Sequence, residues 1–204
     1  MTDRAELLVL YYSASGGTAA LARQIARGAE GAGHGVRLRT VPRVAVTTTT
    51  AEPGVPDDGA PYCTEEDLVA CDALALGSPT RFGNMAAPLK HFLDGTSALW
   101  MRGALAGKAA GVFTSTGSLH GGQETTLTSM ITPLMHHGMI IVGVPYAVPE
   151  LMATRSGGTP YGPSHYAGAA GETAPSDEEA AIARAFGARL GDVGLALASS
   201  RAAS

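Results

Sequence analysis

The residues best suited to chemistry form a short loop, Ser13 to Thr18, with the sequence Ser-Ala-Ser-Gly-Gly-Thr. The loop directly follows the apolar run Leu7 to Tyr11 and precedes a segment with helical periodicity. Glycines let the backbone turn tightly, so backbone N–H groups, hydroxyls and the N-terminus of the next helix can together surround a phosphate. No lysine follows and the glycine spacing is not Gly-x-Gly-x-x-Gly, which argues against a nucleoside-triphosphate loop and a dinucleotide site. The loop therefore predicts a phosphate monoester, that of flavin mononucleotide (FMN), although an ordinary strand-to-helix turn is the alternative.

The elements that must position this loop alternate regularly between strand and helix. Apolar runs predict five strands, and between them apolar residues recur at helical spacing. This alternation indicates an α/β fold, a doubly wound five-stranded parallel sheet with helices on both faces, in the flavodoxin-like order 2-1-3-4-5. The predicted strands lie at residues 7–11, 36–40, 73–77, 109–113 and 139–144.

Length and composition indicate a single domain covering residues 1–204. A segment rich in Gly, Pro and Tyr at about residues 145–175 precedes the last helical pattern, so we expect it to be an insertion that covers the site or forms a subunit contact. The formal net charge of −4 gives no reason to expect a nucleic-acid partner. We see no signal peptide, no membrane-spanning stretch and no metal-ligand spacing around Cys63 and Cys71, so we expect a cytoplasmic protein with no metal site.

Two further loops should meet the first at the carboxyl edge of the sheet. One is Gly77 to Met85 after the third strand, and the other is Thr114 to Glu124 after the fourth. A flavin ring needs flat apolar contacts and donors at its polar edge. Pro79 and Phe82 can supply rigid walls, and the third loop can supply donors that face the flavin carbonyls.

Several of these segments together resemble the WrbA family of FMN-dependent NAD(P)H:quinone oxidoreductases, over nearly the whole chain. The matching segments are Pro79 to Met85, Ser115 to Gly117, Gly121 to Glu124, His136 to Met139 and Gly157 to Gly162. The resemblance implies a flavodoxin-like fold, a homotetramer, NADH or NADPH as electron donor, and two-electron reduction of quinones in a ping-pong reaction.

The same resemblance assigns roles to individual residues. His136 would contact the flavin as the catalytic residue, stabilising reduced flavin or passing a proton to the quinol oxygen, and Trp100 would border the quinone pocket. The residues expected to bind FMN are Ser13, Ala14, Ser15, Gly16, Gly17, Thr18, Pro79, Thr80, Arg81, Phe82, Gly83, Ser115, Thr116, Gly117, Ser118, Leu119, His120 and His136.

One position departs from the family, and other interpretations remain open. The family often has an aromatic residue near the nicotinamide where this chain has Ser15, so the choice between NADH and NADPH is not fixed. The phosphate loop also suits a flavodoxin-like electron carrier without NAD(P)H-driven turnover, and a third, weaker hypothesis is an FMN-linked regulatory binding protein. Core packing would equally explain Trp100, and His34, His91 and His165 receive no role.

Overall fold

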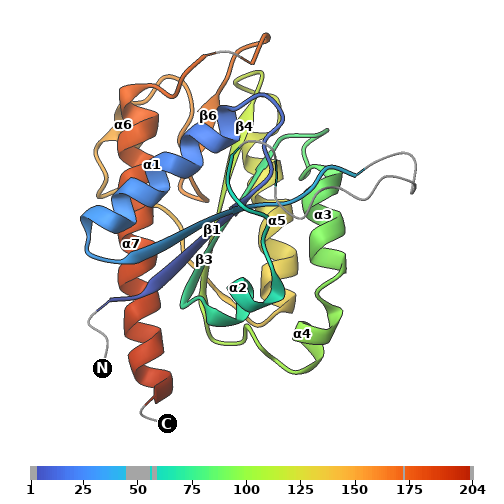
Figure 1. Ribbon diagram of the computed structural model, residues 1–204. Coiled ribbons are helices and arrows are strands. Elements are labelled where there is room, and N and C mark those ends of the chain that lie inside the picture. Colours follow the sequence, from blue (N-terminus) through green and yellow to red (C-terminus); the bar gives the residue numbers. More distant parts are fainter. Residues whose placement is uncertain (1–3, 45–55, 57–58, 172, 203–204) are drawn as a thin grey trace.

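The computed structural model describes residues 4–44, 56, 59–171 and 173–202, and its centre is a parallel sheet (Figure 1). The strands follow the order β2-β1-β3-β4-β5, and a short β6 also pairs with β4. All pairings are parallel, which confirms the predicted flavodoxin-like topology. The strands are β1 (Glu6–Tyr11), β2 (Gly35–Thr40), β3 (Ala73–Pro79), β4 (Ala109–Thr116), β5 (Ile140–Ile141) and β6 (Ser164–Tyr166).

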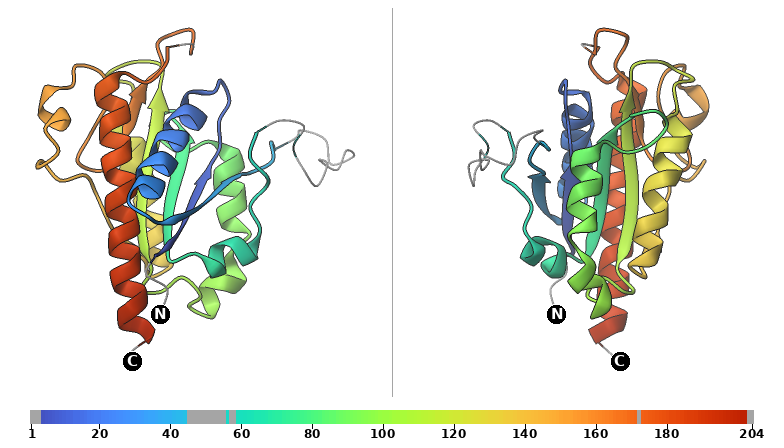
Figure 2. Two further views of the ribbon diagram at one scale, coloured as in Figure 1. Left: turned by 60° about the vertical axis from the view of Figure 1, so that its left-hand side comes forward. Right: turned by 90° about the vertical axis from the view of Figure 1, so that its right-hand side faces the viewer.

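Helices cover both faces of the sheet (Figure 2). Helices α1 and α7 pack on one face, and α2, α3, α4 and α5 pack on the other, while the short α6 packs against α7. No helix in the described part of the chain is long and apolar enough to cross a membrane. The helices are α1 (Gly17–Gly31), α2 (Glu65–Ala70), α3 (Ala87–Asp94), α4 (Ser97–Met101), α5 (Gln123–His136), α6 (Glu150–Ala153) and α7 (Asp177–Ala202).

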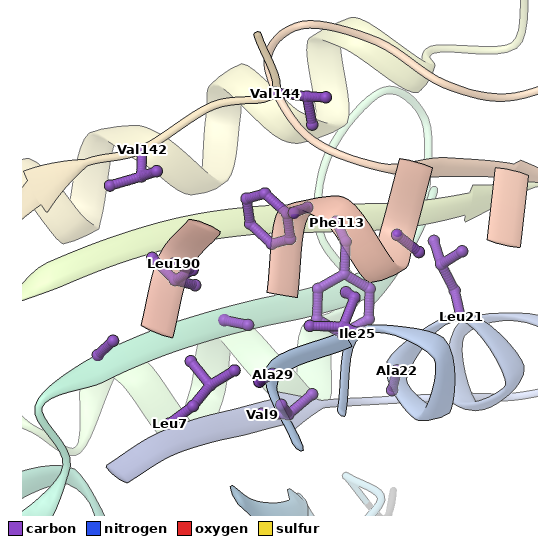
Figure 3. Packing of buried hydrophobic residues seen from close by; sticks show 14 of the residues in the cluster. Leu7, Val9, Leu21, Ala22, Ile25, Ala29, Phe113, Val142, Val144 and Leu190 are labelled. Atoms are coloured by element: carbon purple, nitrogen blue, oxygen red, sulfur yellow. The ribbon is translucent and has the colours of Figure 1, made fainter. Parts of the chain in front are cut away.

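The central strands are apolar on both sides because both faces of the sheet are covered. In β1, Leu7 and Val9 pack toward α1 and α7, whereas Leu8 and Leu10 pack toward the opposite helices. Phe113 of β4 fills the space between the sheet and helices α1 and α7 (Figure 3). The two clusters hold the strands rigidly, so the loops at their carboxyl ends start from fixed positions.

Helices α1 and α7 approach so closely that only glycine fits at the contact. A methyl group on Gly187 of α7 would lie 2.0 Å from the Ile25 carbonyl oxygen of α1. A methyl group on Gly28 of α1 would lie 1.9 Å from the Arg184 carbonyl oxygen of α7. The contact fixes α1, and therefore the loop before it, against the longest helix of the protein.

The fifth strand is divided in two, unlike the continuous strand predicted at residues 139–144. Only Ile140–Ile141 forms β5, and it pairs with the start of β4. The chain then leaves the sheet, and β6 pairs with the end of β4. The expected insertion therefore returns to the sheet at β6, which places residues 167–171 beside the carboxyl edge.

Candidate functional site

The first loop folds around the hydroxyl of Ser13. Ser13 Oγ accepts hydrogen bonds from the backbone N–H groups of Gly16 and Ala19, at 3.2 and 3.3 Å. Gly16 precedes α1 with φ of 92°, a left-handed conformation that favours glycine. Gly16 has no side chain to cap the helix, so Ser13 serves the N–H group of Ala19 while the N–H groups of Gly17 and Thr18 at the start of α1 stay available to a ligand.

The N-terminus of α1 has the properties of an anion site. Its first turn contains no acidic residue, whereas the first turns of α2, α5 and α7 each contain at least one. The hydroxyl of Thr18 is buried and has no hydrogen-bond partner. A buried hydroxyl without a partner is costly, and a phosphate oxygen at the helix N-terminus would supply one. The residues present therefore fit the phosphate of FMN.

All three predicted loops contribute to one cavity of about 220 Å³. This volume is below the roughly 300–1,000 Å³ of pockets that enclose a whole drug-sized ligand, so the cavity can enclose only part of a flavin nucleotide. Of the predicted residues, those that line it are Ala14, Ser15, Thr18, Pro79, Thr80, Arg81, Ser115, Thr116 and Gly117.

A fourth segment, Ala167 to Gly171, completes the cavity; it belongs to the insertion that was expected to cover the site or form a subunit contact, but its residues were not among those predicted to bind FMN. It follows β6, so its position depends on the pairing of β6 with β4. A methyl group on Gly171 would lie 3.0 Å from Ser15 Oγ, so this segment closes on the small side chain of Ser15. The signal available in the sequence was the pair of glycines, Gly168 and Gly171, just after a short β-prone run.

The second loop contains a tight turn that projects Phe82 into solvent. Arg81 and Asn84 exchange backbone hydrogen bonds of 2.8 and 3.0 Å across the turn. The two residues between them have positive φ, 52° at Phe82 and 75° at Gly83. A phenylalanine is strained in this conformation, yet its side chain is fully exposed. Phe82 itself is not among the residues that line the cavity, but it directly follows Arg81, which is.

Buried hydroxyls fix the base of this second loop. Thr126 Oγ1 donates to Thr80 Oγ1 at 3.1 Å, and Thr114 Oγ1 donates to the Ser78 carbonyl oxygen at 2.8 Å. The backbone N–H of Thr80 bonds to the Ser115 carbonyl oxygen, which joins the second loop to the third. Thr80 and Ser115 therefore keep a fixed relative position in the cavity wall.

The third loop contributes only its first part to the cavity. Ser115, Thr116 and Gly117 line it, whereas Ser118, Leu119 and His120 are exposed and lie outside its lining. The hydroxyl of Thr116 donates to the Ser118 carbonyl oxygen at 2.9 Å and shapes the turn.

His136 and Trp100 lie in a different place from the cavity. They line another hollow, of about 660 Å³, between α3, α4 and α5; Asn84 and Met85 of the second loop also line it, but none of the residues described as lining the cavity does. Helix α5 runs 14 residues, about 20 Å, from the carboxyl edge to His136 at the opposite end. Figure 1 shows α4, which carries Trp100, at the end of the molecule opposite β6. Within one chain, the structure does not bring the predicted catalytic histidine to the predicted phosphate loop.

His137 follows His136 in the sequence, lines the same hollow and is half-buried. Burial lowers its pKa, and the adjacent His136 lowers it further. The hydroxyl of Thr96 donates its proton to the Leu93 carbonyl oxygen, so it accepts a hydrogen bond from His137 Nε2 at 3.0 Å. In the neutral ring, Nδ1 of His137 is then a buried acceptor without a partner. In the described part of the chain, no group of three or more His, Cys, Asp or Glu side chains could hold a metal ion.

Comparisons with known proteins agree with the fold. The family model for NADPH-dependent FMN reductase matches residues 6–151. Among solved structures, a flavodoxin, WrbA-like protein from Agrobacterium tumefaciens has a TM-score of 0.65 and 23% identity over 93% of this chain and 97% of its own. A flavodoxin from the domain Archaea has a TM-score of 0.60 and 20% identity, over 95% of this chain and 99% of its own. A flavone reductase has a TM-score of 0.64 and 12% identity, over 98% of this chain and 65% of its own. At these identities the likeness shows the fold.

Proposed function

Because the chain belongs to the NADPH-dependent FMN reductase family, binds FMN and takes electrons from NAD(P)H, we propose that it is an NAD(P)H:quinone oxidoreductase. The observation that carries this proposal is the exposed ring of Phe82, held on strained backbone beside the cavity. A flat aromatic wall suits planar substrates such as a nicotinamide or a quinone. The WrbA-like structural neighbour is consistent with this activity.

The proposed roles of the loops follow from their positions. The N-terminus of α1 and the Thr18 hydroxyl hold the FMN phosphate, with Ser13 keeping the loop in shape. We assign Thr80 and Arg81 of the cavity wall, with the neighbouring Phe82, to the border of the ring, and the Ser115 to Gly117 segment to its polar edge. When bound, FMN would supply the two-electron redox chemistry that couples oxidation of NAD(P)H to reduction of a quinone.

We also propose a ping-pong order of reaction. Phe82 offers one aromatic surface, and both the nicotinamide and the quinone are planar molecules that would use it. Since the two cannot occupy one surface together, the oxidised nicotinamide must leave before the quinone binds.

The roles of His136 and Trp100 require a second copy of the chain. Trp100 lies in α4 and His136 is the last residue of α5, and neither residue lines the cavity at the phosphate loop of the same chain. The expected homotetramer would allow a neighbouring subunit to place His136 over the flavin as proton donor and Trp100 at the quinone pocket. In this arrangement the monomer binds FMN but lacks quinone reductase activity.

The test is anaerobic mixing of FMN-loaded protein with NADH or NADPH, followed by benzoquinone. Loss of the flavin's visible absorbance with the nicotinamide, and its prompt return with benzoquinone, would support the proposal. Absorbance that neither nicotinamide changes would instead favour the electron carrier, an activity consistent with the flavodoxin-type phosphate loop. A parallel measurement of sedimentation and activity across protein concentration tests the role of the assembly.

A further inference from the structure

A buried ion pair lies directly behind the phosphate loop and has no role in the function proposed above. His165 of β6 and Glu179 of α7 are 0% and 1% exposed. His165 Nδ1 lies 2.8 Å from Glu179 Oε2. His165 lies within the insertion and Glu179 lies in the helix that follows it, and neither lines the cavity of the flavin phosphate as described.

Glu179 is held as a carboxylate by several donors. Its oxygens accept backbone N–H groups from Gly157 at 2.7 Å, from Tyr166 at 2.9 Å and from Ser176 at 2.9 Å. Burial alone would raise the pKa of Glu179, but hydrogen bonds from His165, Tyr166 and Ser176 hold it below its usual value. The carboxylate therefore has no proton to offer His165.

The second ring nitrogen of His165 also faces an acceptor. His165 Nε2 lies 2.9 Å from the carbonyl oxygen of Thr173. A carbonyl and a carboxylate can only accept, so both ring nitrogens must carry a proton for both bonds to form. A neutral ring carries a proton on only one nitrogen. The lone pair of the other nitrogen would then face a lone pair of its acceptor oxygen in a buried place, which is costly. The geometry therefore assigns His165 as an imidazolium cation.

This cation touches the first residue of α1. A methyl group on Gly17 would lie 3.2 Å from His165 Cδ2, so that edge of the ring is in contact with the helix N-terminus. Glu179 binds Nδ1, on the other side of the ring. The phosphate loop itself, residues 13–18, contains no lysine or arginine. The positive end of the pair therefore faces the place where the loop would hold a phosphate.

We propose that His165 is a positioning residue that strengthens binding of the FMN phosphate from behind the loop and makes the site select FMN over riboflavin. This inference rests on the proposed assignment of residues 13–18 to the phosphate. A phosphate monoester carries nearly two negative charges at pH 7, whereas riboflavin has the same ring and chain without them. A fixed cation next to the phosphate therefore stabilises FMN and leaves riboflavin almost unaffected.

The experiment compares the dissociation constants of FMN and riboflavin for the wild-type protein and for His165→Gln, by quenching of flavin fluorescence. We expect H165Q to weaken FMN about tenfold and riboflavin by less than about twofold. The matched control is His34→Gln, because His34 is also buried and paired with a carboxylate, Asp192 at 3.1 Å, but follows the C-terminal end of α1, whereas the phosphate loop precedes its N-terminal end. H34Q should leave the ratio of the two constants unchanged. A lower folded fraction would weaken the binding of FMN and of riboflavin equally. The ratio of their two dissociation constants therefore reports on the phosphate alone.

A second measurement uses the wild-type protein and does not depend on a variant. Long-range proton–nitrogen NMR of the imidazole rings at pH 7 should show both nitrogens of His165 protonated, with the signal assigned by its absence from H165Q or from His165→Asn. One unprotonated nitrogen would overturn the proposal, as would equal weakening of FMN and riboflavin in H165Q. Wild-type protein that binds neither flavin would instead refute the proposed function, so the two failures are distinguishable.

Discussion

Trp100 and His136 are joined by a hydrogen bond of 2.8 Å from the indole Nε1 to the backbone carbonyl oxygen of His136. The bond ties α4 to the last turn of α5 and fixes the plane of the half-exposed indole ring. In the proposed assembly, Trp100 and His136 together lie at the flavin site of a neighbouring subunit.

Replacing Trp100 with Phe removes that donor while keeping an aromatic ring. We expect the KM for benzoquinone to rise about fivefold, because the loss of one hydrogen bond is worth about 1 kcal/mol. FMN affinity should not change, since the phosphate loop lies at the other end of the molecule. Steady-state kinetics and a flavin titration measure the two quantities. A fall in FMN affinity with an unchanged KM would count against the assignment.

Thr18→Val replaces a buried hydroxyl that lacks a protein partner with a methyl group of similar size. We expect the flavin-free protein to become more stable by about 1 kcal/mol, and FMN affinity to fall about tenfold. Urea unfolding and a flavin titration measure the two effects. The control is Thr96→Val, because the buried Thr96 hydroxyl donates to the Leu93 carbonyl oxygen and the substitution should destabilise the protein. T18V that is both less stable and unaltered in FMN affinity would contradict the proposed phosphate site.

Phe82→Asn should separate stability from activity. Asparagine tolerates positive φ better than phenylalanine, so the folded protein should gain about 1 kcal/mol in urea unfolding. Quinone reduction should become slower, because the exposed aromatic surface is lost. An F82N protein that is more stable and equally active would show that Phe82 does not contact the substrates.

Gly187→Ala tests the close contact of α1 with α7. The added methyl group would lie 2.0 Å from the Ile25 carbonyl oxygen, so the helices must separate and the free energy of unfolding should fall by about 3 kcal/mol. Gly31→Ala is the control, because a methyl group there meets nothing within 4 Å. G31A should be neutral or slightly stabilising, as alanine favours helix. Equal stability of the two variants by urea unfolding would disprove the contact.

The pH dependence of stability should reflect Glu179. Its pKa in the folded protein lies below the ordinary value of 4.5, so the unfolded chain takes up a proton first as the pH falls. The contribution of Glu179 is therefore complete above about pH 4.5 and is lost as the pH falls through the folded pKa. Urea unfolding between pH 3 and 7 should show this loss of stability in the wild type. The control Glu30→Gln should show the same loss, because it removes only an exposed carboxylate. Glu179→Gln should be less stable at pH 7 and show a shallower slope, and an unaltered slope would contradict the prediction.

The fold was predictable from the sequence because each central strand is a short apolar run and each helix has a regular apolar face. The flavodoxin-like order and the convergence of three loops follow from that alternation. The division of the fifth strand was not predictable, since the apolar run at residues 139–144 continues past Ile141 and only the distant pairing of β6 with β4 shows where the strand ends. The cavity wall at residues 167–171 depends on the same pairing.

The position of His136 in the candidate site depends on where helix α5 begins and ends, which the sequence motifs do not show. Helix α5 starts at the carboxyl edge, so a residue in its last turn, such as His136, must lie at the other end of the sheet in the same chain. The family resemblance named the residue without saying which subunit it serves. His165 had no sequence neighbour to suggest a partner, because Glu179 and the Thr173 carbonyl reach it only through the fold.

The divided fifth strand also bears on how copies of this protein avoid joining through their sheets. A long exposed border strand offers unpaired backbone groups to other chains and promotes aggregation. Here that border consists of pieces of two and three residues, β5 and β6, separated by the insertion. The opposite border, β2, carries Arg37 and Arg39, both within reach of Asp67. An incoming strand would find neither border long and uncharged, so neither border favours pairing of sheets between copies of the chain.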